Sequence, residues 1–152
     1  MNYFVKLWIV FILIGCSKSD KKPICNIEKI DHPQSEKITI NRVIRFGEKK
    51  ENLIKHFGQP DSAYIYYAEM SDIYEDVLRY KNSEFYFDEN KLIGFDLHDT
   101  LFFLQIDDVK IKIGDVENCG KDSVYRKKIQ NSDEYLMFII KNNKMSQIHT
   151  WF

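Results

Sequence analysis

The sequence lacks most of the features that identify a function directly. Its 152 residues carry 22 Lys and Arg against 23 Asp and Glu, and this balance excludes a strong electrostatic attraction to nucleic acid. The chain contains no Gly-rich phosphate loop, no HExxH or GxSxG motif, no CxxC pair and no zinc-ligand spacing. Enzymatic activity therefore has no support from motifs, and neither a cofactor nor a metal is predicted.

The sequence also lacks an apolar run long enough to cross a bilayer. A membrane-spanning helix needs about 20 such residues, whereas the longest unbroken run, at residues 7–14, has eight. This length is typical of the hydrophobic region of a signal peptide. The run leads into Leu13-Ile14-Gly15-Cys16, which resembles the lipobox of bacterial lipoproteins.

The lipobox resemblance implies a location. Residues 1–15 would be removed as a lipoprotein signal peptide, and Cys16 would become a lipidated N-terminus that anchors the chain to a membrane of the bacterial cell envelope. Because Ser17 follows the cysteine in place of Asp, the resemblance favours the outer membrane, with the domain in the periplasm or at the cell surface. Residues 16–37 contain two prolines and few consecutive apolar residues, so we expect a flexible lipidated tether there.

Lipidation of Cys16 leaves two cysteines, Cys25 and Cys119. In an oxidising compartment an even pair favours a disulfide. Two free thiols fit the sequence equally well, because spacing along the chain does not give the geometry that a disulfide needs. Both alternatives stay open at this point.

Residues 38–152 predict a single α+β domain that is mainly antiparallel sheet with one short amphipathic helix. The helix is expected at residues 49–57, where apolar side chains share one face and Gly58 and Pro60 follow the end. Runs rich in Tyr, Phe, Ile and Leu, separated by turn residues, predict the strands. These strands are expected at residues 38–40, 43–46, 62–67, 76–80, 83–87, 92–97, 101–105, 109–113, 123–129, 135–140 and 145–152.

Aligning the chain with itself indicates two tandem halves, residues 38–99 and 100–152. Phe46-Gly47-Glu48 aligns with Ile113-Gly114-Asp115, the segment 61–64 aligns with 122–125, and the segment 87–92 aligns with 140–145. The second copy lacks the helix. Chance similarity between short hairpins is the alternative explanation.

The order of these elements resembles two groups of small periplasmic modules, the BamE/SmpA-OmlA lipoproteins and the β-lactamase inhibitor protein. The residues that carry the resemblance are Gly47, Phe57, Gly58, Pro60, Asn90 and Lys91. The resemblance implies units of a helix and three strands, and a non-catalytic role in binding another envelope protein or supporting an assembly. An inhibitor-like or immunity-like lipoprotein is one version of that role.

The polar residues that could carry chemistry are Asp96, His98 and His149. Strand alternation places Asp96 and His98 on one face, and His149 belongs to the last predicted strand. Such a group could bind a divalent metal, pair a base with a carboxylate or hold a small ligand, so these residues are the candidates for a small metal-dependent enzyme or a ligand binder. The alternative is a solvated polar face at the end of a hairpin.

Tyrosines are concentrated in the first half of the domain. Tyr64 and Tyr66 share one face of a predicted strand, and Tyr67 points to the other. Exposed together, these side chains would form a partner-binding surface, because tyrosine offers contact area at low entropic cost. Ordinary cross-strand packing is the alternative.

Overall fold

The computed structural model describes residues 25–69, 71–117 and 119–151. The predicted signal peptide, Cys16 and the first part of the predicted tether lie outside these ranges. The α+β class is confirmed, because the described residues form mostly antiparallel strands with one α-helix. The elements are η1 (Asn26–Lys29), η2 (Ser35–Lys37), β1 (Ile38–Ile40), β2 (Ile44–Arg45), α1 (Lys50–Phe57), β3 (Ser62–Ala68), β4 (Ile73–Tyr80), β5 (Ser83–Asp88), β6 (Lys91–Leu97), β7 (Phe103–Ile106), β8 (Val109–Lys112), β9 (Ser123–Lys128), β10 (Tyr135–Lys141) and β11 (Lys144–Trp151).

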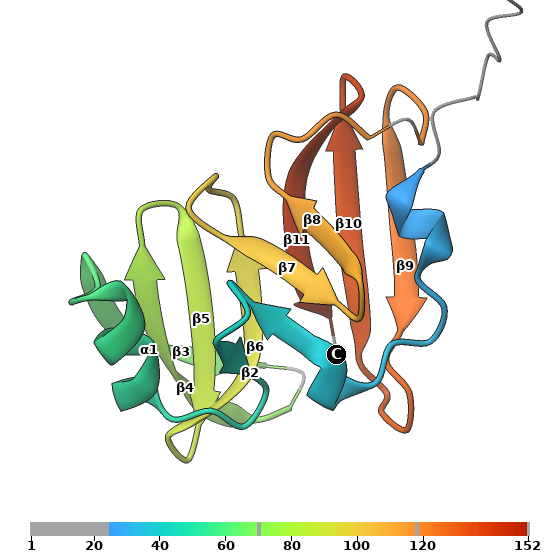
Figure 1. Ribbon diagram of the computed structural model, residues 1–152. Helices are drawn as coiled ribbons and strands as arrows, with labels where there is room; N and C mark the ends of the chain where they lie inside the picture. The colour runs from blue at the N-terminus through green and yellow to red at the C-terminus, as the bar shows by residue number, and fades with distance from the viewer. Residues whose placement is uncertain (1–24, 70, 118, 152) are drawn as a thin grey trace, which may run out of the picture.

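The strands form two antiparallel sheets. The small sheet has the order β2-β1-β7-β8, and the large sheet has the order β3-β4-β5-β6-β11-β10-β9. Figure 1 shows the small sheet crossing one face of the large sheet, with α1 beside β3 and β4 at one end. In this view the large sheet consists of two groups of strands, β3 to β6 and β9 to β11, which meet where β6 pairs with β11.

Two tight turns help to set the register of the large sheet. Glu89 and Asn90 join β5 to β6, and Asn142 and Asn143 join β10 to β11, all four with positive φ. Two-residue hairpin loops with positive φ at both positions match the twist of the strands they connect, and Asn tolerates this conformation better than most residues. Each hairpin also contains one register shift, which bends the strands locally.

Helix α1 is short and depends on packing. Leu53 is fully buried, and Ile54 and Phe57 pack against the core. The helix ends at Gly58, whose φ of 83° is readily adopted only by glycine and whose N–H donates to the Ile54 carbonyl at 2.8 Å. An eight-residue helix has little stability of its own, so its contacts with the core keep it folded.

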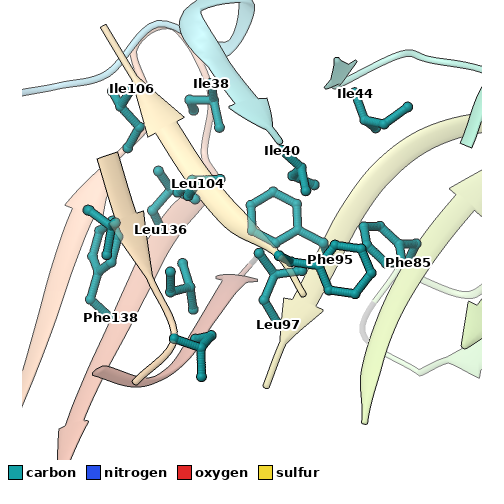
Figure 2. Close-up of a cluster of buried hydrophobic side chains, with 14 of the residues drawn as sticks. Ile38, Ile40, Ile44, Phe85, Phe95, Leu97, Leu104, Ile106, Leu136 and Phe138 are labelled. Atoms are coloured by element: carbon teal, nitrogen blue, oxygen red, sulfur yellow. The ribbon is translucent and has the colours of Figure 1, made fainter. Parts of the chain in front are cut away.

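The main core lies between the two sheets (Figure 2). Each side chain in this group is at most 2% exposed, and full burial of a large apolar side chain contributes roughly 1.5–3 kcal/mol. Packing between the sheets therefore fixes which face of the large sheet points outward. The labelled side chains are Ile38, Ile40, Ile44, Phe85, Phe95, Leu97, Leu104, Ile106, Leu136 and Phe138.

The N-terminal segment corrects the prediction of a tether over residues 16–37. Cys25, Ile27 and Ile30 are at most 3% exposed and belong to the core, and η1 contacts β8. A 3-10 turn repeats every three residues, so Ile27 and Ile30 lie on one side of it and are buried together. From residue 25 onward, this segment is part of the domain.

Cys25 and Cys119 form a disulfide, with their Cα atoms 4.8 Å apart. Of the two alternatives that the sequence left open, the structure contains the disulfide. The bond joins the N-terminal segment to the loop between β8 and β9, across a sequence separation of 94 residues. Beside it, the Asn26 N–H donates to the buried Glu117 carboxylate at 3.3 Å.

Candidate functional site

The outer face of the large sheet carries most of the residues that the sequence singled out for binding or chemistry, namely Asp96, His98, His149, Tyr64 and Tyr66. The small sheet and α1 cover the opposite face, and within the described part of the chain no further element covers the outer one. Strand β5 shows the division, because Phe85 and Phe87 are fully buried while Glu84 and Tyr86 are only half-buried. Side chains on the outer face are therefore available to a ligand or partner.

Asp96 lies at the centre of this face and is held by its neighbours. Its Cα pairs with that of His149 where β6 meets β11. His98 Nε2 lies 3.0 Å from Asp96 Oδ1, and Gln147 Nε2 donates to both carboxylate oxygens at 3.0 and 3.2 Å. The structure thus brings together the three candidates Asp96, His98 and His149, and adds Gln147.

The environment of His149 favours the neutral imidazole. Burial lowers the pKa of His149, and the nearby Asp96 carboxylate opposes part of that shift. A histidine with a lowered pKa is uncharged at neutral pH. Among the residues that the structure describes, no group of three or more His, Cys, Asp and Glu side chains is placed to hold a metal ion.

The three tyrosines chosen from the sequence lie on β3, at the edge of the large sheet. Tyr64, Tyr66 and Tyr67 are 41%, 49% and 42% exposed. Tyr66 packs edge-on against Tyr86 on β5, with ring centroids 6.4 Å apart. Tyr67 packs against Tyr74 instead, so the two faces of the β3 edge both carry exposed aromatic rings.

Glu84 links two of the outer-face tyrosines. Tyr64 Oη donates to Glu84 Oε1 at 2.8 Å, and Tyr86 Oη donates to Glu84 Oε2 at 2.9 Å. Burial and the hydrogen bond to Glu84 raise the pKa of Tyr64 to about 12, and the same causes raise the pKa of Tyr86. Both hydroxyls therefore stay protonated at neutral pH and act as donors to a carboxylate rather than as bases.

A pocket of about 550 Å³ opens on the outer face where the β3–β4 hairpin approaches the end of β11. This volume lies within the range of about 300–1,000 Å³ found for small-molecule sites. The pocket joins the aromatic edge to the central polar cluster. Residues that line it include Tyr66, Glu75, Tyr86, Asp96, His149 and Trp151.

Glu75 is the residue of this pocket that the sequence reasoning missed. It is 5% exposed, and burial, together with the Asp88 charge, raises the pKa of its carboxyl group. We expected this strand to begin at Asp76, whereas β4 begins at Ile73. Extending the alternation back from Val77 would have placed Glu75 on the outer face.

Comparison with known proteins gave no match to a family model, to a curated protein or to a solved structure. In the part of the chain that the structure describes, no helix is long and apolar enough to span a membrane.

Proposed function

We propose that the protein is a lipid-anchored lipoprotein of the bacterial cell envelope whose domain binds another protein and catalyses no reaction. The anchor follows from Leu13-Ile14-Gly15-Cys16 after an eight-residue apolar run, with Cys16 as the lipidated residue. The outer membrane is the favoured location, with the domain in the periplasm or at the cell surface. An inhibitor-like or immunity-like lipoprotein is one version of this proposal.

The observation that carries this proposal is the exposed apolar surface at the β3 edge. Ile65 is 69% exposed and Tyr74 is 72% exposed, beside the three exposed tyrosines of β3. Edge strands that expose apolar side chains invite pairing with another chain, and soluble proteins usually protect them. Clustered tyrosines provide contact area at low entropic cost, so this edge suits a protein partner.

We further propose that the domain consists of two related halves, residues 38–99 and 100–152. Both sheet orders support this proposal, because β1 meets β7 at the centre of the small sheet and β6 meets β11 near the centre of the large one. Asp96 and His149 align in the repeat and lie opposite each other, as a two-fold relation between halves requires. Helix α1 and β3 would then be additions to the first half. The counterpart of β9 would be β4, which corrects the alignment of 61–64 with 122–125.

Hydrogen bonds at equivalent positions give the repeat independent support. The Gly47 N–H donates to the Leu92 carbonyl at 2.8 Å, and the Gly114 N–H donates to the Met145 carbonyl at 2.8 Å. These four residues occupy matching positions in the alignment of the two segments. If the two halves resembled each other only by chance, there would be no reason for the same long-range backbone hydrogen bond to occur in both.

A second candidate function is binding of a small ligand, or catalysis on it, in the outer-face pocket. The observation in its favour is the convergence of Asp96, His98 and His149. The Asp96 carboxylate already accepts hydrogen bonds from Gln147 and contacts His98, which leaves it poorly placed to act as a free base. Protein binding therefore remains the function that we put first.

Two experiments test the proposal. In the first, Cys16→Ser should move the protein from the membrane fraction to the soluble fraction; unchanged fractionation would refute the anchor. In the second, partners that co-purify from envelope membranes are identified, purified and titrated against the protein.

The binding titration has a matched control. The double variant Tyr64→Ser/Tyr66→Ser should weaken binding to the purified partner at least tenfold, because it removes exposed rings from β3. Val124→Ser should not, since Val124 is also exposed, at 61%, but lies on β9 at the opposite edge of the same sheet. Equal affinity of both variants would exclude the β3 edge as the interface.

A further inference from the structure

The pocket on the outer face combines aromatic walls with acidic groups. Tyr66, Tyr86 and Trp151 contribute rings, and the carboxylates come from Glu69, Glu75 and Asp96. No lysine or arginine is among the described residues that line it. Aromatic rings with nearby carboxylates form the usual environment for an organic cation, which the ring faces attract electrostatically.

The carboxylates of Asp96 and Glu75 differ in whether other side chains already contact them. Asp96 is occupied by Gln147 and His98. As a residue Glu75 is 95% buried, and its side chain makes no hydrogen bond or ion pair with the other residues that the structure describes, although its carboxylate oxygens are not fully shielded from solvent. Glu75 is therefore the buried acidic residue of this pocket that lacks a protein partner, whereas Glu69, which also lines the pocket, is exposed to solvent.

A mostly buried carboxylate without a protein partner is destabilised, because burial removes part of its hydration and no hydrogen bond replaces it. A positively charged group in the pocket would supply that interaction. The nearby side chains do not: His149 is neutral at neutral pH, and Arg79 lies 4.0 Å from Glu84, on the next strand. The described side chains therefore leave the Glu75 carboxylate open to a positive group from another molecule.

We infer that this pocket receives the ammonium or guanidinium group of a Lys or Arg side chain presented by a partner protein. The inference rests on the proposed protein-binding function and adds the chemistry of the contact. The cation lies against Tyr66 and Trp151, with its charge toward Glu75. Tyr64, which is exposed on the same side of β3, contacts the surface around that side chain.

Trp151 offers a direct test, because the only other tryptophan is Trp8, at the N-terminus. The mature protein that begins at the lipidated Cys16, and so lacks Trp8, is titrated in detergent micelles with Nα-acetyl-arginine amide and Nα-acetyl-lysine amide while Trp151 fluorescence is recorded. We expect a saturable change with both probes. Nα-acetyl-norleucine amide, which has no charge, should produce none.

Two substitutions locate the binding. Glu75→Gln should weaken probe binding at least fivefold, because it removes the unpaired charge and keeps the shape. Glu134→Gln is the matched control: burial also raises the pKa of Glu134, but this residue is not among those lining the pocket. Unfolding midpoints recorded for both variants establish that they are folded.

The outcomes separate the inference from the function on which it rests. The inference would be overturned by any of three results: no saturable binding, equal binding of the norleucine probe, or unchanged binding by Glu75→Gln. The proposed protein-binding function would still stand if a partner bound through the β3 edge. Probe binding that needs Glu75, together with loss of partner affinity in Glu75→Gln, supports both. Probe binding that needs Glu75 without any effect on the partner would show a site for a free amine, and would overturn the assignment to a partner side chain.

Discussion

Removal of the Cys25–Cys119 disulfide is expected to destabilise the domain by several kcal/mol. The bond closes a loop with a sequence separation of 94 residues. In the chain-entropy model a loop of this length restricts the unfolded chain enough to contribute about 4.7 kcal/mol to stability. The double variant Cys25→Ala/Cys119→Ala keeps small apolar side chains at both positions, so most of its loss should come from that entropy.

The measurement is urea unfolding of the oxidised protein and of the double variant, each also carrying Cys16→Ser. With a slope of about 1.5 kcal/mol per molar urea, the expected loss lowers the midpoint by about 3 M. The variant should also unfold with a steeper slope, because its unfolded chain is no longer restricted by the cross-link.

Reduction of the oxidised protein with dithiothreitol provides the control, and should reproduce the behaviour of the double variant. Equal midpoints for the oxidised protein and the variant would refute the reasoning. Two titratable thiols in the oxidised, urea-unfolded protein would refute the linkage itself.

Three further predictions concern the core and the outer face. Phe138→Ala should lower the free energy of unfolding by about 3–5 kcal/mol in urea titrations, since Phe138 is fully buried between the sheets; a loss below 1 kcal/mol would contradict that packing. Glu75→Gln should raise the thermal midpoint at pH 7. Because the folded-state pKa of Glu75 lies above 4.5, this residue contributes stability at low pH that is lost as pH rises through the folded pKa, and Gln avoids that loss. The gain should therefore vanish below about pH 4, and a gain that persisted there would contradict this explanation. Because the folded-state pKa of His149 lies below 6.5, this residue contributes stability that is present above pH 6.5 and is lost as pH falls through the folded pKa. His149→Gln should therefore make the free energy of unfolding less dependent on pH below 6.5. An unchanged pH profile would refute His149 as a cause of that dependence.

Local patterns were sufficient to predict most of the elements. Helix α1 follows from the spacing of Leu53 and Phe57 and from Gly58 after it, and these signals depend only on neighbouring residues. Strands of the hairpins were also predicted well, because the apolar runs and the turn residues between them lie within a few positions of each other in the sequence. Where β4 begins was predicted less well, since Tyr74 and Glu75 do not continue an apolar run.

The folded N-terminal segment and the pocket could not be derived in this way. Ile27 and Ile30 lie among charged residues, so their burial depends on contacts with strands that are distant in the sequence. The pocket requires the pairing of β6 with β11, which brings Asp96 beside His149, and the approach of the β3–β4 hairpin. The sequence could nominate Asp96 and His149, but the partners of each carboxylate are set by the tertiary structure.

The disulfide also limits how far the domain can stand from a membrane. If Cys16 carries the lipid, the chain is fixed again at Cys25, and nine residue steps span at most about 30 Å even when fully extended. A tether reaching to Ile38 would have allowed about 75 Å. Figure 1 shows η1 beside β9, at the opposite end of the large sheet from β3. The anchor would therefore hold the β9 end close to the lipid surface and direct the β3 edge away from it, toward proteins that approach from the aqueous side.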